Sequence, residues 1–388
     1  YYFEIDQEDE FRRKGFCKNN TRNPLVQMGL LLDADAIPIT YRLFKGNTHD
    51  SQTMMPIMQK VRAVYGLDRI ITVADKALNS GDNVAFLMAK GDGFIFSQKI
   101  RGACQDFQSY VFDPEGYVEK RGIVRHIDAW NEKDNSEDIP VFRMKSRIYP
   151  QEFWVTYVDD IKRKIPLDVK QIVCYNELYA KRQKHKRAEL IEKAQKIIQN
   201  PKRYDKREAG GALRYVRNIE YDPETGECIT TKRVPYLDEK KIVEDEKYDG
   251  YYAIITSELD MSDHEVVKAY HELWEIEHSF RITKSDLESR PVHVSLKQRI
   301  EAHFLTCFIA LLILRLLCKR LDEKYAPEQL IQSLRKYQVC FVKDNVFKTT
   351  YYDQIIKDIG ETLNLTLNKR FFRTGDIKQL VADTKKKM

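Results

Sequence analysis

The chain lacks the short motifs that identify several common enzyme classes. It has no Gly-rich phosphate loop followed by Lys-Ser/Thr, no Gly-x-Ser-x-Gly segment and no His-x-x-x-His pair. None of its seven cysteines forms a Cys-x-x-Cys pair, which argues against zinc ribbons and redox motifs, so free thiols in a reducing compartment are expected. Chemistry based on carboxylates is compatible with these absences.

Long hydrophobic runs are also missing. The apolar run from Phe304 to Leu314 is eleven residues long and ends at Arg315, so it predicts a buried core helix rather than a membrane span. No signal peptide is visible, and no membrane partner is expected. Because the chain begins with Tyr1, we expect a fragment whose native start lies upstream.

Length and composition are those of a globular protein. The 388 residues are enough for two or three domains, and 43% are hydrophobic and 32% charged. The formal net charge of +6 is a weak indication of a polyanionic partner.

The first hundred residues predict alternating strands and helices. Two strands, Leu25–Leu32 and 37–44, form a hairpin, and a helix begins near Met54. The nearly continuous apolar run from Arg69 ends at Asp75 and is typical of a central strand covered on both faces. A helix capped by Asn79 or Ser80 and a short strand at 93–97 follow. Asp75 therefore lies at the carboxyl end of a strand, where sites form in open α/β sheets.

The predicted secondary structure changes twice in the rest of the chain. Residues 103–260 contain strand-like pieces and one basic helix, and the chain is helical after 260. A cluster of cations on one helix is usually a solvated face, but it also fits contacts to a DNA backbone. The aromatic residues Trp130 and Trp154 are mainly core candidates. The cationic cluster comprises Lys181, Arg182, Lys184, Lys186 and Arg187.

One predicted helix carries a carboxylate where its pattern calls for a core residue. Burying Glu277 is costly unless the side chain is paired or binds a metal. An ion pair with Arg281 or Lys284 and a metal site are both open on this pattern alone. The pattern is one stripe of residues spaced four and three apart in a continuous helix: Val266, Tyr270, Leu273, Glu277, Phe280 and Lys284.

A strand-end carboxylate and a helix carboxylate, far apart in sequence, can converge on divalent metal. Mg²⁺ prefers oxygen ligands and takes one or two carboxylates per ion. Two such ions can activate an attacking water or hydroxyl and stabilise the leaving oxygen of a phosphodiester. Asp75 and Glu277 are the candidate catalytic and metal-binding residues.

Two segments of the chain resemble one known family. Val-Ala-Asp75-Lys-Ala-Leu-Asn-Ser-Gly-Asp-Asn83 is similar to the second-Asp segment of DDE transposases of bacterial insertion sequences, in the broad IS-four group. Tyr270, Glu277 and Lys284 fit three of four places in that family's Tyr-x2-Arg-x3-Glu-x6-Lys signature. Leu273 stands where many members have Arg, a departure at one DNA or phosphate contact. The resemblance covers residue 1 to about 320.

The resemblance implies an α/β fold with an RNase H-like mixed sheet flanked by helices, a β-rich insertion and a helical C-terminal part. It implies a core in two parts, residues 1–102 and 261–321, separated by an insertion at 103–260 and followed by a helical region at 322–388. The family's first Asp would lie before Tyr1, so the chain as given is expected to be catalytically incomplete; Glu4, Asp6 and Asp9 are nearby acids.

The resemblance also implies an activity and its partners. The expected enzyme is a DNA transposase that cuts at element ends and joins them to target DNA, with two Mg²⁺ ions per site for which Mn²⁺ can substitute. Tyr270, Arg281, Lys284 and the cationic cluster are the expected DNA contacts. A homodimer on the terminal inverted repeats and a cytoplasmic, nucleoid-associated location in a bacterium are expected.

Two other functions remain compatible with the residues. One is an RNase H-like nuclease that cuts structured DNA without joining strands. The other is a non-catalytic DNA-binding remnant of a transposase.

Overall fold

The computed structural model describes residues 1–4, 7–15, 23–121, 140–221, 227–229 and 234–386. The chain forms two compact units. The sheet unit comprises Asp50–Met55 and Gly66–Leu273, and the helical unit comprises Tyr1–His49, Pro56–Tyr65 and Trp274–Met388.

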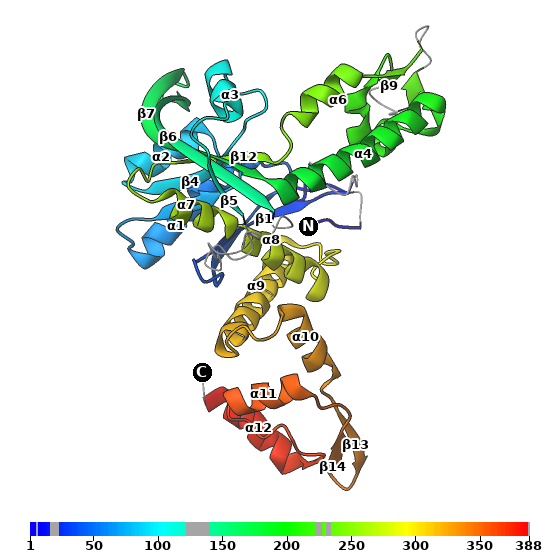
Figure 1. Ribbon diagram of the computed structural model, residues 1–388. Helices are drawn as coiled ribbons and strands as arrows, with labels where there is room; N and C mark the ends of the chain where they lie inside the picture. Colours follow the sequence, from blue (N-terminus) through cyan, green and yellow to red (C-terminus); the bar gives the residue numbers. More distant parts are fainter. Residues whose placement is uncertain (5–6, 16–22, 122–139, 222–226, 230–233, 387–388) are drawn as a thin grey trace. The chain divides into compact units, whose positions relative to one another are not determined.

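A six-stranded mixed sheet organises the sheet unit (Figure 1), with the strand order β3-β4-β12-β7-β6-β5. Strands β3 and β4 are parallel, and the other neighbours are antiparallel. Side chains alternate between the two faces, so α7 packs through Val266 against Ile254 while α3 packs through Phe107 against Ala253 on the other face. The bounds are β3 Ile71–Ala74, α2 Gly81–Ala89, β4 Gly93–Gln98, α3 Gln105–Phe112, β5 Val118–Arg121, β6 Val141–Thr156, β7 Lys162–Asn176, β12 Tyr251–Thr256 and α7 Asp263–His271.

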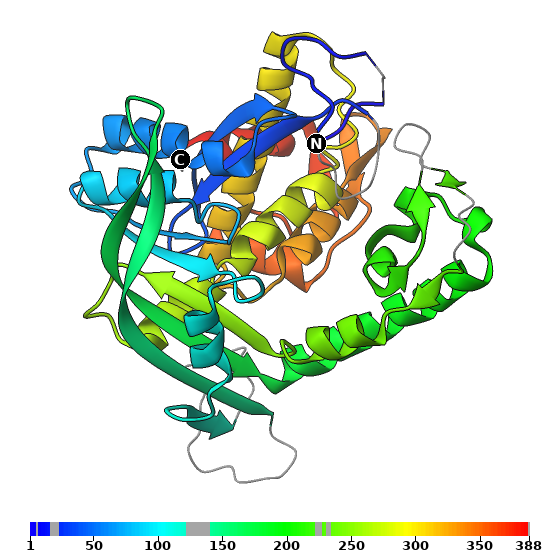
Figure 2. The same ribbon diagram turned by 90° about the horizontal axis from the view of Figure 1, so that it is seen from above.

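Strands β6 and β7 form one long curled ribbon, teal and green in Figure 2. The end of β6 packs closely on the first residue of α2, because a Cβ at Gly81 would lie 2.0 Å from the Trp154 carbonyl oxygen. The Asp82 carboxylate accepts hydrogen bonds from the Thr156 backbone at 2.6 Å and from its hydroxyl at 3.2 Å. Trp154 is 58% exposed, so its prediction as a core residue was wrong. Trp130 lies outside the described residues.

Helix α4, Glu177–Gln199, leads from β7 into a small lobe, called the α4 lobe here (Figure 1). The lobe has its own core, in which Ala194 and Ile197 of α4 pack with Ala212 and Tyr215. Its other elements are η3 Pro201–Arg203, α5 Lys206–Ala209, η4 Gly210–Tyr215, β8 Val216–Arg217, β9 Glu220–Tyr221, β10 Cys228–Ile229, β11 Tyr236–Leu237 and α6 Glu239–Glu246.

The helical unit begins with the predicted hairpin, formed by β1 Val26–Leu32 and β2 Pro38–Lys45. The Asp33 carboxylate accepts hydrogen bonds from the backbone N–H groups of Asp35 at 3.0 Å and Ile37 at 2.8 Å, which closes the turn. After the hairpin, the chain forms η1, Asp50–Gln52, and then the predicted helix α1, Met54–Tyr65.

Helix α9, Lys297–Arg320, contains the apolar run and buries one face. Phe304 is 0% and Leu311 1% exposed, whereas Leu305 is 47% and Ile313 51% exposed. The predicted core helix is therefore confirmed for one of its faces. Among the described helices, α9 is long and apolar enough to cross a membrane by length and composition alone, a test that core helices also pass.

The chain after α9 is helical but also contains a small sheet that the sequence pattern did not predict. Strands β13, β14 and β15 pair in that order, all antiparallel. Its elements are α10 Pro327–Lys336, β13 Val339–Lys343, β14 Val346–Thr349, α11 Gln354–Thr362, β15 Phe371–Arg373 and α12 Thr374–Lys386. The predicted α/β class, with a curled mixed sheet and a helical C-terminal part, is confirmed and is consistent with an RNase H-like transposase fold.

Two local predictions were wrong. Strand β3 lies at the edge of the described sheet rather than at its centre, and Ile71 is 38% exposed while Ala74 is 4% exposed. The continuous helix predicted around Glu277 is broken, because α7 ends at His271 and α8, Trp274–Arg281, begins after a two-residue interruption. A π-helical turn, Ile282–Asp286, follows α8 and shifts the helical phase again. The four-part domain division stays a prediction.

Candidate active site

Asp75 follows β3 directly, as predicted, and its side chain is exposed. One carboxylate oxygen, Oδ1, accepts a hydrogen bond from the Ala77 backbone N–H at 2.8 Å. The other oxygen has no hydrogen-bond or ion-pair partner among the described residues. Asp75 thus caps its own turn and still presents one oxygen that a ligand can reach.

The loop between β3 and α2 is tied to its surroundings by two asparagines. Asn79 donates from Nδ2 to the Ser97 carbonyl at 3.0 Å, at the carboxyl end of the parallel strand β4. Asn83 donates to the Leu78 carbonyl at 2.8 Å and to the Ser51 carbonyl at 3.0 Å. From the sequence, Asn79 was predicted only as an alternative cap of the next helix, a place that Ser80 takes, and Asn83 was given no role.

Tyr270 lies on α7 near Asp75. Burial raises the pKa of the Tyr270 phenol; a hydrogen bond with the Ser97 side chain works against this rise, and the charge of Asp75 adds to it. The ring stacks on Tyr252 with 6.4 Å between centroids, and the Tyr252 hydroxyl lies 2.8 Å from Nε2 of His271. Tyr270 is therefore a neutral, half-buried phenol beside a carboxylate, able to donate a hydrogen bond to a phosphate oxygen.

Glu277 lies on α8 in the helical unit, and its side chain is exposed. The expectation that it faces a core was wrong, because the interruption at 272–273 removes α8 from the stripe that begins on α7. Within the described residues Glu277 forms no hydrogen bond or ion pair, so the predicted alternative of a pair with Arg281 or Lys284 is absent from the structure. Its carboxylate is open to a ligand.

A network on the opposite side of α8 fixes the helix that carries Glu277. Arg315 of α9 is 8% exposed; its Nη2 donates to the Ser279 hydroxyl at 2.8 Å and lies 2.8 Å from the Glu275 carboxylate. Nε2 of His278 lies 3.1 Å from the Glu328 carboxylate of α10. Glu275 raises the pKa of the His278 imidazole, burial works against this rise, and Glu328 adds to it. Sequence reasoning missed this network, since its members come from three helices.

The two cations predicted near Glu277, Arg281 and Lys284, have different surroundings. Arg281 forms an ion pair with Glu328, and its own side chain is 63% exposed. The Lys284 ammonium lies 5.0 Å from the Phe280 ring centroid and 5.3 Å from that of Tyr1. Both keep the positive charge that a DNA phosphate requires, and the predicted contact stays a prediction.

The donor chemistry of Asp75 and Glu277 fits a hard divalent cation. Each offers a carboxylate oxygen without a protein partner, and oxygen is the ligand atom that Mg²⁺ prefers. No group of three or more His, Cys, Asp or Glu side chains suited to a metal ion occurs in the described part of the chain. Asp75 and Glu277 belong to different units, so their predicted convergence on metal stays a prediction.

The cationic cluster on α4 divides into two groups. Lys181, Arg182, Lys184 and Lys186 are exposed, and Lys181 pairs with Glu177 at 2.8 Å. Arg187 is only 7% exposed. Its guanidinium donates two hydrogen bonds to Asp249, both at 2.6 Å. Arg187 is therefore occupied by an internal partner. Arg187 shares a helix face with the buried Ala194 and Ile197, but the sequence alone does not show that Asp249 is its partner.

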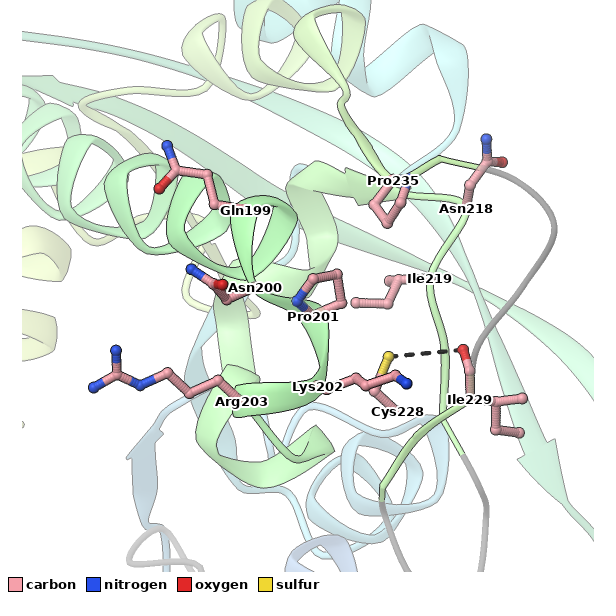
Figure 3. A pocket seen from close by; sticks show the side chains of 10 residues that line it. All are labelled: Gln199, Asn200, Pro201, Lys202, Arg203, Asn218, Ile219, Cys228, Ile229 and Pro235. Atoms are coloured by element: carbon pink, nitrogen blue, oxygen red, sulfur yellow. Dashed lines mark hydrogen bonds between the residues drawn. The ribbon is translucent and has the colours of Figure 1, made fainter.

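The α4 lobe contains a pocket of about 660 Å³ that the sequence analysis did not predict. Figure 3 shows Pro201 and Ile219 lying next to each other, while Arg203 extends away from them. Its lining mixes cations and amides with apolar groups and includes no carboxylate of the kind that Asp75 offers. The lining residues are Gln199, Asn200, Pro201, Lys202, Arg203, Asn218, Ile219, Cys228, Ile229 and Pro235.

The described cysteines are free thiols, as expected: Cys104, Cys174, Cys228, Cys307, Cys318 and Cys340.

Comparison with known proteins identifies the family. A family model described as "Transposase DDE domain" matches residues 3–313, which include β1 to α8 and most of α9. No curated protein matches the chain. The matched range contains both Asp75 and Glu277, each at a place where its carboxylate is exposed. The chain belongs to the family of transposase DDE domains.

Proposed function

We propose that the protein is a transposase of a bacterial insertion sequence, in the IS-four group, that cuts DNA at the element ends and joins them to target DNA. The observation that carries this proposal is the family match over residues 3–313. The free carboxylate oxygens of Asp75 and Glu277 support it, because this chemistry uses acidic side chains.

The reaction has two steps. Water attacks a phosphodiester at the element end; a new P–O bond forms, the bond to the 3′ oxygen breaks, and that oxygen leaves as a 3′-OH with a proton. The 3′-OH then attacks a phosphodiester of target DNA in line, so the element becomes joined and the target releases its own 3′-OH. Asp75 and Glu277, together with the first Asp that the resemblance implies, would hold two Mg²⁺ ions, for which Mn²⁺ can substitute, and the ions would activate the attacking oxygen and stabilise the leaving one.

The remaining site residues would bind the DNA backbone. Tyr270 would donate its phenolic hydrogen to a phosphate beside Asp75, and Arg281 and Lys284 would neutralise phosphates near Glu277. On α4, the exposed Lys181, Arg182, Lys184 and Lys186 would contact double-stranded DNA, whereas Arg187 is held by Asp249. We propose that the protein acts as a homodimer on the terminal inverted repeats, in the cytoplasm and on the nucleoid.

The test is an assay that separates cutting from joining. The protein, produced from its native start, is incubated with labelled DNA from the flanks of its own gene and with a target plasmid, with and without Mg²⁺ or Mn²⁺. We expect metal-dependent cutting at the element ends and transfer of the labelled 3′ end to the plasmid. Cutting without joining would instead identify a structure-specific nuclease, and specific binding without cutting would identify a non-catalytic remnant.

A further inference from the structure

Asn83, on the first turn of α2, is a fully buried amide next to the loop that carries Asp75. Its side chain is 0% exposed. The amide donates to the Leu78 carbonyl at 2.8 Å, within the loop, and to the Ser51 carbonyl at 3.0 Å, in η1. One side chain thus joins α2, the loop and η1.

The same loop has further ties at its ends. The Leu78 N–H donates to the Asp75 carbonyl at 3.2 Å, and the Ala77 N–H donates to the Asp75 carboxylate at 2.8 Å. The Asp75 carboxylate is therefore hydrogen-bonded to the backbone of residue 77, and the Asp75 main-chain carbonyl to that of residue 78. Because Asn83 holds the Leu78 carbonyl, the Asn83 amide acts on Asp75 through the backbone of this turn.

Helix formation by itself does not require an amide at position 83. Ser80 already provides the N-cap, since its hydroxyl accepts a hydrogen bond from the Asn83 backbone N–H at 3.3 Å. Moreover, Oδ1 of Asn83 is buried without a hydrogen-bond partner among the described residues, and an unpaired buried oxygen opposes folding. The unpaired oxygen is a cost that the helix itself does not require, and such costs are expected where a site demands a particular geometry.

We propose that Asn83 is a positioning residue for Asp75, which holds the 75–80 loop so that the carboxylate keeps the orientation needed for DNA cleavage. The proposal rests on the function proposed above, because it assigns Asp75 to the reaction. Asn83 itself touches neither DNA nor the reacting atoms. Its loss therefore lowers the rate of cutting and leaves the affinity for DNA unchanged.

The test replaces Asn83 with Leu, which has a similar shape but no donor, and with Asp, which has the same shape but is an acceptor when ionised. Gln171→Leu is the matched control, because Gln171 is 1% exposed and its amide donates to Gln151 at 2.9 Å within the ribbon. The first readout is hydrogen exchange of the backbone amides of residues 77–80. The second is the cutting rate and the apparent KM for DNA, at a temperature where all variants are folded.

We expect both Asn83 variants to exchange the loop amides at least ~10-fold faster and to cut about 100-fold more slowly, with the KM for DNA unchanged. The Gln171→Leu control is expected to leave loop exchange and cutting within about twofold of wild type. Unchanged loop exchange in a folded variant would overturn the proposal, as would a loosened loop with cutting within about threefold of wild type. If Asn83→Leu does not fold, Asn83→Asp tests the proposal by the same loop-exchange and cutting criteria.

Failure of the proposed function gives a different result. Asp75→Asn run in the same series would then still cut, or the wild-type protein would not cut at all. A wild-type protein without cutting overturns the positioning role of Asn83 in cleavage together with that function, and loop exchange then reports only whether the amide holds the loop.

Discussion

Replacement of Arg187 by Met separates a structural role from the DNA contact that its sequence position predicts. The Arg187 side chain is 8% exposed and faces Asp249, whose side chain is 18% exposed. Both terminal nitrogens donate to this carboxylate at 2.6 Å, and Glu246 lies 3.5 Å away. Met fills a similar volume and removes the charge, so Asp249 would remain partly buried without its partner.

The size of the effect follows from the burial of the two groups. Breaking a buried ion pair by removal of one partner costs about 3–5 kcal/mol. Asp249 retains some contact with water and Glu246 is 51% exposed, so we expect a loss below that range, about 2–3 kcal/mol in the free energy of unfolding. Adding Asp249→Asn to the Arg187→Met protein removes the unpaired charge and should recover part of that loss.

The assay combines urea denaturation with DNA binding at several salt concentrations. Lys186→Met is the matched control, since Lys186 is exposed on the same helix; its unfolding free energy should stay within about 0.5 kcal/mol, while the slope of log affinity against log salt falls by about 1. Arg187→Met should show the reverse, lower stability and an unchanged slope. A stable Arg187→Met protein with a reduced salt slope would show instead that Arg187 contacts DNA.

Three further predictions concern the surroundings of the two carboxylates. Arg315→Met should lower the free energy of unfolding by about 2–4 kcal/mol in urea denaturation, because Glu275 loses its partner; a loss below ~0.5 kcal/mol would contradict this. The raised pKa of His278 stabilises the fold fully below about pH 6.5, and that stabilisation is lost as the pH rises through the folded-state pKa; His278→Gln should flatten the curve of urea midpoint against pH, and parallel curves would disprove the contribution. Tyr270→Phe keeps the ring stack and should slow cutting about 10-fold or more, with an unchanged melting temperature; wild-type cutting would exclude the phenol from phosphate binding.

Local elements were predictable from the sequence where one short segment determines them. The β1–β2 hairpin depends on Asp33, which satisfies the turn by itself. Helix α2 depends on the Ser80 cap, and the place of Asp75 depends on the apolar run before it. In each case the decisive hydrogen bonds join residues that are close in sequence, so periodicity and capping rules were sufficient.

Features that depend on distant contacts were not predictable in the same way. Helical periodicity assumes a constant phase, and neither the interruption at 272–273 nor the π turn after Arg281 changes the apolar spacing enough to be seen. The burial of Arg187 requires Asp249, which lies 62 residues later in the chain. Within the described residues the short strands β13 to β15 pair with one another, and β13 is exposed along its whole length, so it shows no alternation of buried and exposed residues.

The proposed function requires Asp75 and Glu277 to act in one metal-dependent site. The most direct measurement compares Mn²⁺-dependent cutting by Asp75→Asn, by Glu277→Gln and by the control Glu152→Gln, a carboxylate on the ribbon that pairs with Lys164. We expect both site variants to bind element-end DNA as tightly as wild type and to cut at least about 1,000-fold more slowly, while the control cuts normally. Normal cutting by either site variant would show that its carboxylate is not part of the metal site.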